Sequence, residues 1–246
     1  MSDKPNELKS CLNCPIRLRG ICSLCGSEEL KKLEGMKYYR RYEAGQTVVW
    51  EGDEMNFVAS VETGIATLCE TLSDGRIQMV GLLLPSDFLG HPGRATAPYE
   101  VTANTDLLLC CFRRNEFEKL IEETPHIGQR LLEITLDELD AARDWMLVLG
   151  RKTAREKVAS LIAVVAKREA ALQQCVPDGC FSFDLQLSRE SMANYLGLTL
   201  ETVSREISAL RQDRLIELDG KRGFTIPDFE ALVLESGEDF DDRLSV

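Results

Sequence analysis

The sequence predicts an α+β protein in which a β-rich region, one long helix and a small helical domain follow one another. Three observations lead to this prediction. From residue 38 to residue 112, short runs of Val, Ile, Leu and Thr are separated by glycines, as in antiparallel sandwiches and barrels. A helical pattern then runs unbroken from Pro125 to Gly150. Between residues 187 and 226, two short capped helices precede a hairpin, which is the order of a winged helix-turn-helix.

Two short helices are expected to flank the β-rich region. Ser27 is followed by two glutamates, so we expect it to cap a helix that has acids in its first turn. Within the region, residues 73–76 read Ser-Asp-Gly-Arg, which favours a hairpin turn. Asn115 and Glu118 have the spacing of a capping box and open the second helix, which should stop before Pro125.

The long helix is expected to begin with Thr124 as its cap and Pro125 in its first position. It carries two apolar stripes, and one stripe would suffice to dock it on a sheet. A second stripe indicates a partner helix packed as in a coiled coil, so we favour a parallel two-fold dimer over a helix buried within a monomer. One stripe contains Ile127, Leu131, Ile134, Ala141, Trp145 and Val148, and the stripe assigned to the dimer interface contains Leu132, Leu139, Ala142, Met146 and Leu149.

The C-terminal part has the helix caps and the turn glycine that are typical of a helix-turn-helix. Ser188 and Thr199 are expected to cap two short helices joined by a turn at Gly197, and residues 215–226 read as a hairpin, or wing. The plain alternative is a small helical domain with an ordinary solvated face, but caps, turn and wing occur together here. Polar side chains on the second helix have the chemistry to read base edges: Arg for guanine, Glu for cytosine, Ser for either. They are Glu201, Thr202, Ser204, Arg205 and Ser208.

Four of the nine cysteines lie within fifteen residues near the start of the chain. A thiolate is a soft ligand that suits zinc or iron–sulfur clusters, and the arginines in this stretch favour thiolates over thiols. The stretch therefore predicts a thiophilic site, and we interpret it as a labile, redox-sensing cluster whose state is reported to DNA. The four are Cys11, Cys14, Cys22 and Cys25.

Three other interpretations of these cysteines differ in weight. Disulfides need an oxidising compartment, and the first residues lack the apolar core of a signal peptide. A zinc site is a real competitor because both halves read Cys-x-x-Cys, although seven residues between the pairs is short beside the ~15–20 usual there. A thiol oxidoreductase built on Cys22 and Cys25 would not need a winged helix-turn-helix.

Composition and charge limit the class of protein. Apolar residues make up 44% of the chain, and no run approaches the ~18 residues of a membrane span, so we expect a soluble, cytoplasmic protein. The net charge of −12 argues superficially against nucleic acid, but the stretch 228–246 carries seven acids and one base. Specific DNA binding requires a local basic footprint and not a basic protein.

Residues 187–206 read Leu-Ser-Arg-Glu-Ser-Met-Ala-Asn-Tyr-Leu-Gly-Leu-Thr-Leu-Glu-Thr-Val-Ser-Arg-Glu and resemble the helix-turn-helix of the CRP/FNR family. The order of parts is also similar: a cyclic-nucleotide-binding-like β-roll, a long dimerisation helix and a winged helix-turn-helix. Glu201, Ser204 and Arg205 match the FNR branch, whose members read TTGAT-type half-sites. The resemblance covers nearly the whole chain. It implies a homodimeric transcription regulator, and no enzyme, that binds a palindromic operator in double-stranded DNA and works with RNA polymerase.

The spacing of Cys11, Cys14 and Cys22 is similar to that of FnrL-type members of the FNR branch, which carry an oxygen-labile 4Fe–4S cluster. The resemblance implies that these three cysteines hold such a cluster, together with one cysteine near the end of the β-roll. Cys25 lies outside the family pattern and is a spare or alternative ligand.

The fourth ligand is either Cys110 or Cys111. Residues 107–112 look like a strand, so the two adjacent side chains point to opposite faces, and periodicity does not choose between them. Family members place the ligand cysteine, one further residue and then an apolar residue, an order that selects Cys110 and leaves Cys111 as the alternate.

Two departures from the family are informative. Cyclic-nucleotide-binding relatives have Glu after the Phe-x-Gly of the phosphate loop and Arg-Ser further on, where this chain has His91 and Ala97-Pro98. This weakens the case for cyclic-nucleotide binding. Some FNR proteins carry an Asp on the dimer helix that helps to keep the cluster-free form monomeric. Here the position is Ala142, so a strict monomer–dimer switch is not implied.

We therefore expect an oxygen-sensing, iron–sulfur transcription regulator, and the alternative is a family member with structural zinc or no metal that responds to another signal in the β-roll. The expected parts are a cysteine-rich segment at 1–26, the β-roll at 27–123, the dimerisation helix at 124–150, the winged helix-turn-helix at 151–230 and an acidic tail at 231–246.

Overall fold

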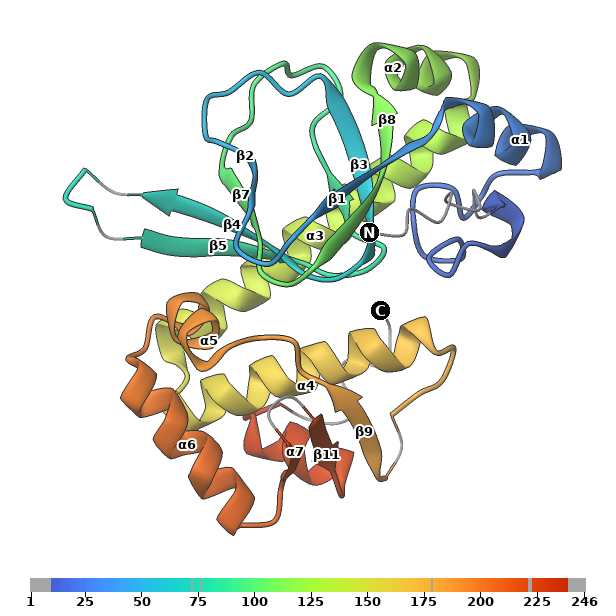
Figure 1. Cartoon of the computed structure of the whole chain (residues 1–246). Helices are drawn as coiled ribbons and strands as arrows, with labels where there is room; N and C mark the ends of the chain where they lie inside the picture. Colours follow the sequence, from blue (N-terminus) through green and yellow to red (C-terminus); the bar gives the residue numbers. More distant parts are fainter. Residues whose placement is uncertain (1–9, 72, 76, 178, 221–222, 239–246) are drawn as a thin grey trace, which may run out of the picture.

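The computed structural model describes residues 10–238 except 72, 76, 178, 221 and 222. Figure 1 shows a β-roll at one end, a small helical domain at the other, and one long helix, α3, that runs from the first to the second. The N-terminal loop lies beside α1, close to the end of the β-roll at which α3 begins.

The β-roll consists of two four-stranded antiparallel sheets with the orders β1-β8-β3-β6 and β2-β7-β4-β5. Apolar side chains from both sheets form its interior, among them Val61, Ala66 and Leu109. The predicted turn at 73–76 lies between the paired strands β4 and β5, which confirms the hairpin, although residue 76 lies outside the described residues. The strands are β1 (Tyr38–Tyr42), β2 (Thr47–Val49), β3 (Phe57–Thr63), β4 (Ala66–Thr71), β5 (Ile77–Leu83), β6 (Phe88–Leu89), β7 (Glu100–Ala103) and β8 (Leu107–Arg113).

Helices α1 (Ser27–Met36) and α2 (Arg114–Glu123) bury Leu30, Leu33, Phe117 and Leu120 against the outer face of one sheet. Helix α1 begins one residue earlier than predicted, and α2 begins two residues earlier.

At the start of α1, the backbone N–H of Gly26 donates to the Glu29 carboxylate at 2.7 Å, so Gly26 and not Ser27 is the cap. At α2, the expected capping box at Asn115 is wrong. Strand β8 runs straight into the helix, and the Arg114 N–H donates to the Asn56 carbonyl at 2.9 Å, so Arg113 takes the cap position.

Helix α3 (Pro125–Arg151) begins as predicted, with Thr124 before it and Pro125 in its first turn. Its ends pack on the chain, since Ile127 and Val148 are buried. Residues 135–143 are exposed all round the helix. Ala141, which was assigned to the stripe expected to dock the helix, is therefore exposed, and its assignment is wrong.

The C-terminal domain confirms the predicted caps at Ser188 and Thr199, and Thr153 caps a third helix in the same way. The side chains of Thr153, Ser188 and Thr199 accept backbone N–H groups at the starts of α4, α5 and α6, and Gly197 turns the chain with φ +62°, a conformation that favours glycine. The elements are α4 (Ala154–Leu172), β9 (Phe181–Asp184), α5 (Arg189–Leu196), α6 (Leu200–Gln212), β10 (Glu217–Asp219), β11 (Gly223–Ile226) and α7 (Phe229–Glu235).

Two features of this domain differ from expectation. The wing has a third strand, β9, paired with β11. The acidic tail predicted from residue 231 is instead helical at its start, because Phe229, Leu232 and Val233 follow helical spacing and are buried in the core of the C-terminal domain. The number of acids in this stretch obscured that spacing. Residues 239–246 of the expected tail lie outside the described residues.

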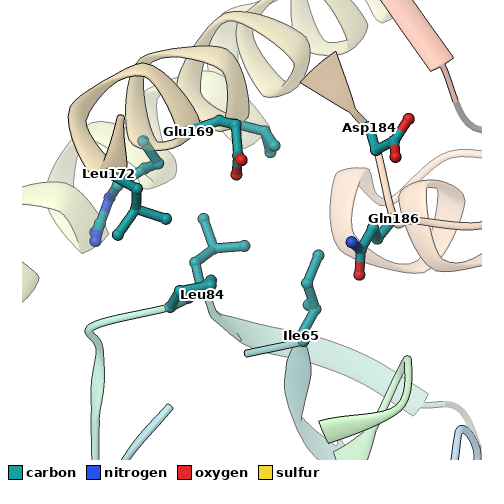
Figure 2. A pocket seen from close by; sticks show the side chains of 10 residues that line it. Ile65, Leu84, Glu169, Leu172, Asp184 and Gln186 are labelled. Carbon is teal, nitrogen blue, oxygen red and sulfur yellow. The ribbon is translucent and has the colours of Figure 1, made fainter. Parts of the chain in front are cut away.

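The two domains contact each other directly. Arg168 of α4 pairs with Asp87 of the β-roll at 2.6 Å, and the Asn104 amide donates to the Gln186 carbonyl at 3.1 Å. The contact leaves a small hollow, which is lined by Ile65 and Leu84 of the β-roll and by Glu169, Leu172, Asp184 and Gln186 of the C-terminal domain (Figure 2). None of the helices described for this chain is both long enough and apolar enough to cross a membrane.

Candidate metal centre and nucleic-acid interface

Short-range turns shape the cysteine segment Cys11–Cys25. A 3-10 turn occupies Cys11–Asn13, and the Cys11 N–H donates to the Glu34 carboxylate of α1 at 3.0 Å. Further along, the Gly20 N–H donates to the Ile16 carbonyl at 2.9 Å. Ile16 and Ile21 are buried, so two apolar anchors fix the loop from which the thiols project.

Strand β8 places its two cysteines on opposite faces, which confirms the expected alternation. Cys111 is fully buried among the side chains that fill the β-roll. Cys110 lies on the outer face and packs in the same apolar group as Cys11, Cys22 and Cys25. Its neighbours across the sheet are Tyr39 of β1 and Ser60 of β3. The structure thus brings Cys110, and not Cys111, to the N-terminal thiols.

Electrostatic interactions connect the thiols that the sequence singled out. Burial raises the pKa of the Cys22 thiol to about 12, and Cys14, Cys25 and Cys11 add to the shift. Burial also raises the pKa of Cys110, which Lys37 opposes and Cys14 and Cys11 reinforce. A metal group that takes thiolates must therefore displace protons from thiols that are held protonated.

Lys37 is a residue that the sequence analysis missed. Its side chain is buried, and its Nζ donates to the Cys11 sulfur at 3.4 Å. A buried ammonium at this position would offset part of the negative charge of a thiolate-ligated metal group. The sequence signal was weak, since Lys37 stands between a helix and a strand without any pattern.

The spacing of Cys11, Cys14, Cys22 and Cys110 bears on which group they fit. Among the residues that the structure describes, no three of these four sulfurs lie within 4.8 Å of one another. Tetrahedral zinc with Zn–S bonds of ~2.3 Å requires sulfurs ~3.8 Å apart. In a 4Fe–4S cluster each thiolate binds a different iron, so the sulfurs stand further apart. The donor set, four thiols in an apolar surrounding, fits such a cluster.

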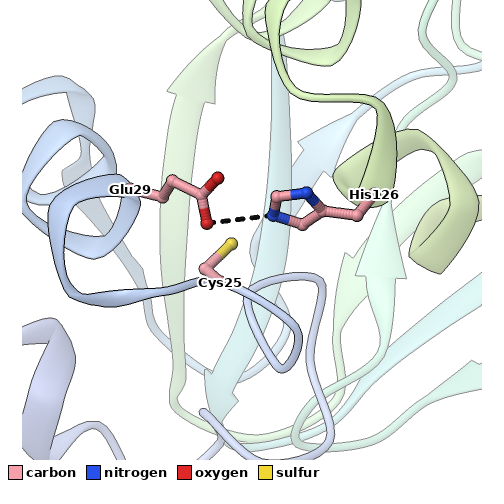
Figure 3. Close-up of side chains that lie close together, drawn as sticks. All are labelled: Cys25, Glu29 and His126. Carbon is pink, nitrogen blue, oxygen red and sulfur yellow. Dashed lines mark hydrogen bonds and ion pairs between the residues drawn. The ribbon is translucent and has the colours of Figure 1, made fainter.

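Cys25, the alternate ligand, packs in the same apolar group as Cys11, Cys22 and Cys110. Its side chain lies beside Glu29 and His126 (Figure 3). Burial raises the pKa of the Cys25 thiol to about 11, and Glu29 adds to the shift while Arg17 opposes it.

Helix α6 presents the predicted base-reading residues, though not equally. Glu201, Ser204 and Arg205 are exposed. Thr202 is half-buried, and its hydroxyl lies 2.8 Å from the Thr199 hydroxyl within the helix cap. The Ser208 hydroxyl donates to the Ser204 carbonyl at 2.8 Å. Three of the five side chains are therefore directly available to a groove.

Glu206 holds the Arg205 guanidinium in place in this structure. Two Arg205 nitrogens donate to one Glu206 oxygen at 3.3 Å. The pair is uneven in burial, since the Arg205 side chain is 66% exposed and that of Glu206 is 14% exposed. The Glu206 carboxylate thus orients the Arg205 guanidinium, which remains largely exposed to solvent.

The predicted dimer stripe on α3 lies open in the single chain. Leu132, Leu139 and Met146 are 58%, 45% and 72% exposed, Ala142 is exposed and Leu149 is half-buried. The sequence analysis missed two further exposed apolar side chains of α3, namely Leu136 and Leu147. Leu136 lies four residues after Leu132 and three before Leu139, a step that the predicted stripe passed over.

The fold and these sites define a class: a DNA-binding regulator with a cyclic-nucleotide-binding-type β-roll and a helix-turn-helix. Comparison with known proteins supports this class. Residues 39–124 match the model of the cyclic nucleotide-binding domain, and residues 156–234 match that of the Crp-like helix-turn-helix domain. The chain belongs to the CRP/FNR family, to its FnrL type.

Individual relatives place the chain within this family, whose members are DNA-binding regulators and not enzymes. It is 62% identical over 246 residues to the transcriptional activator protein FnrL of Cereibacter sphaeroides, covering 100% of this chain and 99% of that protein. It is 35% identical to the nitrogen fixation regulation protein FixK of Bradyrhizobium diazoefficiens, over 85% and 86% of the two chains. The solved structure of FixK2 from Bradyrhizobium japonicum is similar with a TM-score of 0.70 and 30% identity, over 80% of this chain and 95% of that one.

Proposed function

We propose that the chain is a homodimeric, oxygen-responsive transcription activator that holds a 4Fe–4S cluster on Cys11, Cys14, Cys22 and Cys110. The observation that carries this proposal is the convergence of a thiol from β8 with three thiols of a loop almost a hundred residues earlier in the chain. Bound there, the cluster would supply an oxygen-labile link between that loop and the sheet.

The residues around the thiols support this role. The apolar side chains beside Cys110 exclude water, and Lys37 places a positive charge at Cys11. The Arg130 guanidinium of α3 donates to the Arg19 carbonyl at 3.0 Å. A change in the shape of the cysteine segment therefore reaches the long helix through a direct contact.

The DNA-reading part supports a two-fold arrangement. The exposed apolar face of α3 fits a second copy of the helix packed in parallel. Two α6 helices would then enter successive major grooves about 34 Å apart. Glu201, Ser204 and Arg205 carry the chemistry for a TTGAT-type palindrome. An activator bound there would contact RNA polymerase.

The rival function is a family member with a structural zinc ion in place of the cluster. The sequence spacing favours the cluster, since only seven residues separate Cys14 from Cys22, whereas zinc sites built on two Cys-x-x-Cys pairs usually have ~15–20 residues between the pairs. The experiment is to purify the protein without oxygen, count iron, sulfide and zinc, and measure operator binding before and after air.

We expect about four irons per chain, a visible absorption that air bleaches, and operator binding that falls with it. A protein without iron, or operator binding that survives complete loss of the absorption, would contradict the proposal.

A further inference from the structure

Three potential ligands meet outside the proposed cluster set. The Cys25 sulfur, a Glu29 carboxylate oxygen and a His126 ring nitrogen lie within 4.8 Å of one another. Among the described residues, no other group of three or more His, Cys, Asp or Glu ligand atoms is as close. Figure 3 shows the Cys25 sulfur pointing into the space between the carboxylate and the ring.

Three different elements supply these side chains, and each is fixed by its own backbone. Cys25 ends a turn in which its N–H donates to the Cys22 carbonyl at 3.2 Å. Glu29 lies in the first turn of α1 and accepts from the Gly26 N–H at 2.7 Å. His126 lies in the first turn of α3, behind Pro125. The arrangement is therefore a property of the folded chain and not of a single flexible loop.

The donor set is the one that zinc prefers. Sulfur, imidazole nitrogen and carboxylate oxygen are its usual ligands, and three protein ligands leave a fourth position for water. The His126 Nε2 atom is 2.9 Å from a Glu29 oxygen, and two bonds of ~2.0–2.1 Å at the tetrahedral angle span ~3.3 Å. An opening of a few tenths of an ångström between these two atoms would admit the ion.

Charge and access also fit an ion. A thiolate, a carboxylate and a neutral imidazole cancel the charge of a divalent metal, so the loaded site is neutral and its burial is not opposed by an unpaired charge. Cys25 is 5% exposed, whereas the side chains of Glu29 and His126 are 30% and 38% exposed. The site thus has a buried sulfur end and an open end through which the ion enters.

We propose that Cys25, Glu29 and His126 bind one zinc ion, separate from the metal group held by the other four cysteines. On binding, the Cys25 thiol loses its proton to solvent and its sulfur bonds to the ion. His126 binds through Nε2 with its proton on Nδ1, and the Glu29 carboxylate exchanges its hydrogen bond to the ring for a bond to the ion. No oxidant or reductant is required.

This zinc would join the end of the cysteine segment to the start of α3. Cys25 follows Cys22 by three residues, and His126 is the second residue of α3. The ion would hold the loop against the helix and reserve the fifth thiol, so that Cys25 does not compete for the place of Cys22 in the other group.

The test is a metal count on the full-length protein, purified without oxygen, exposed to Zn²⁺ and desalted. We expect one zinc per chain in addition to any iron. His126→Ala and Cys25→Ser should lose that zinc or bind it ~10-fold or more weakly. His126→Cys should retain it, because a thiolate is also a zinc ligand. Glu29→Gln preserves the capping acceptor of α1 but should weaken zinc binding.

The matched controls are substitutions of a histidine and a cysteine that lie outside the proposed zinc site. His91→Ala removes the other histidine of the chain, and Cys180→Ser removes an exposed thiol. Neither substitution should change the zinc count. Thermal unfolding of each variant shows whether it is folded.

The outcomes separate this inference from the proposed function. A zinc count that does not change in His126→Ala overturns the inference. Zinc that is lost with Cys11→Ser, Cys14→Ser and Cys25→Ser but kept in His126→Ala would place the ion among the cysteines alone, and it too overturns the inference. Iron content is read independently, so a protein without iron but with His126-dependent zinc contradicts the proposed function and supports the zinc site.

Discussion

The cysteine region and helix α6 are functional surfaces of opposite kinds. Helix α6 is complete in one element: its cap, its buried side and its exposed polar residues all lie between Thr199 and Gln212. The cysteine region joins a loop at Cys11–Cys25 to strand β8, and burial raises the pKa values of the Cys22 and Cys110 thiols and so keeps these two protonated. A site of the first kind keeps its shape without a ligand. A site of the second kind depends on the group that it binds, which suits a sensor.

The largest effect is expected from a substitution that removes a proposed cluster ligand and leaves α6 unchanged. Cys110→Ala should lose the cluster, with iron falling from about four per chain to near zero and anaerobic operator binding falling with it. Cys111→Ala is the matched control, because its side chain faces the interior of the β-roll; it should retain the iron and lose only some stability. Iron analysis and operator titration check both variants. The reverse result, with iron lost only in Cys111→Ala, would make Cys111 the fourth ligand, and retention of iron by both variants would make it Cys25.

A second change tests whether the two regions communicate through a dimer. Ala142→Asp places a carboxylate on the exposed face of α3, where two like charges would be desolvated together. We expect dimerisation to weaken by at least ~10-fold, which costs about 1.4 kcal/mol, with iron content unchanged. Sedimentation at several protein concentrations measures this. Lys157→Asp, on α4, is a control that should leave the association constant as it is. Unchanged association of Ala142→Asp would show that this position lies outside the interface.

A smaller effect is expected on α6 itself. Arg205→Ala should lower specific operator binding by ~1–3 kcal/mol if the guanidinium contacts a guanine through two hydrogen bonds. Binding to unrelated DNA should change much less. Competition between operator and random duplexes at fixed salt gives the ratio. An equal loss on both duplexes would indicate a phosphate contact.

The smallest effect is expected from a substitution at the N-terminal cap of α6. Thr199 accepts the Thr202 N–H at 3.1 Å, so Thr199→Ala removes the cap of the helix and should cost about 1 kcal/mol of stability. Thr199→Ser keeps the acceptor and is the control. Chemical denaturation measures the difference, and equal stability of the two variants would mean that the cap contributes nothing.

The same contrast explains what could be predicted from the sequence. The caps of the helix-turn-helix were predicted, because Ser188 and Thr199 act on backbone N–H groups three residues away. The two faces of β8 followed from strand geometry, but the choice of Cys110 needed a family resemblance, since Leu107, Leu108, Leu109 and Phe112 make both faces apolar. Helix α7 was missed because its acidic neighbours concealed the apolar spacing of Phe229, Leu232 and Val233.

Contacts between distant segments left no local signal. Lys37 reaches Cys11, and His126 reaches Glu29 across 97 residues, yet neither side chain stands in a recognisable pattern. Pairings of this kind depend on how α1, α3 and β8 meet, which periodicity does not specify. The stripe assigned to the dimer interface was incomplete, because Leu136 follows Leu132 by four residues and precedes Leu139 by three, the same helical spacing, and is also exposed.

Helix α3 contacts both the cysteine segment and the C-terminal domain. Arg130 contacts the cysteine segment, and Trp145 stacks on Tyr195 of α5 with ring centroids 4.6 Å apart. Fifteen residues separate the two contacts, or ~22 Å of helix. A tilt of about 5° at the first contact would move the second by ~2 Å, and two-fold symmetry would double the change in separation to ~4 Å, since both subunits tilt. Neighbouring base pairs are ~3.4 Å apart along the duplex, so a rotation this small would shift the two recognition helices by about one base pair relative to their operator.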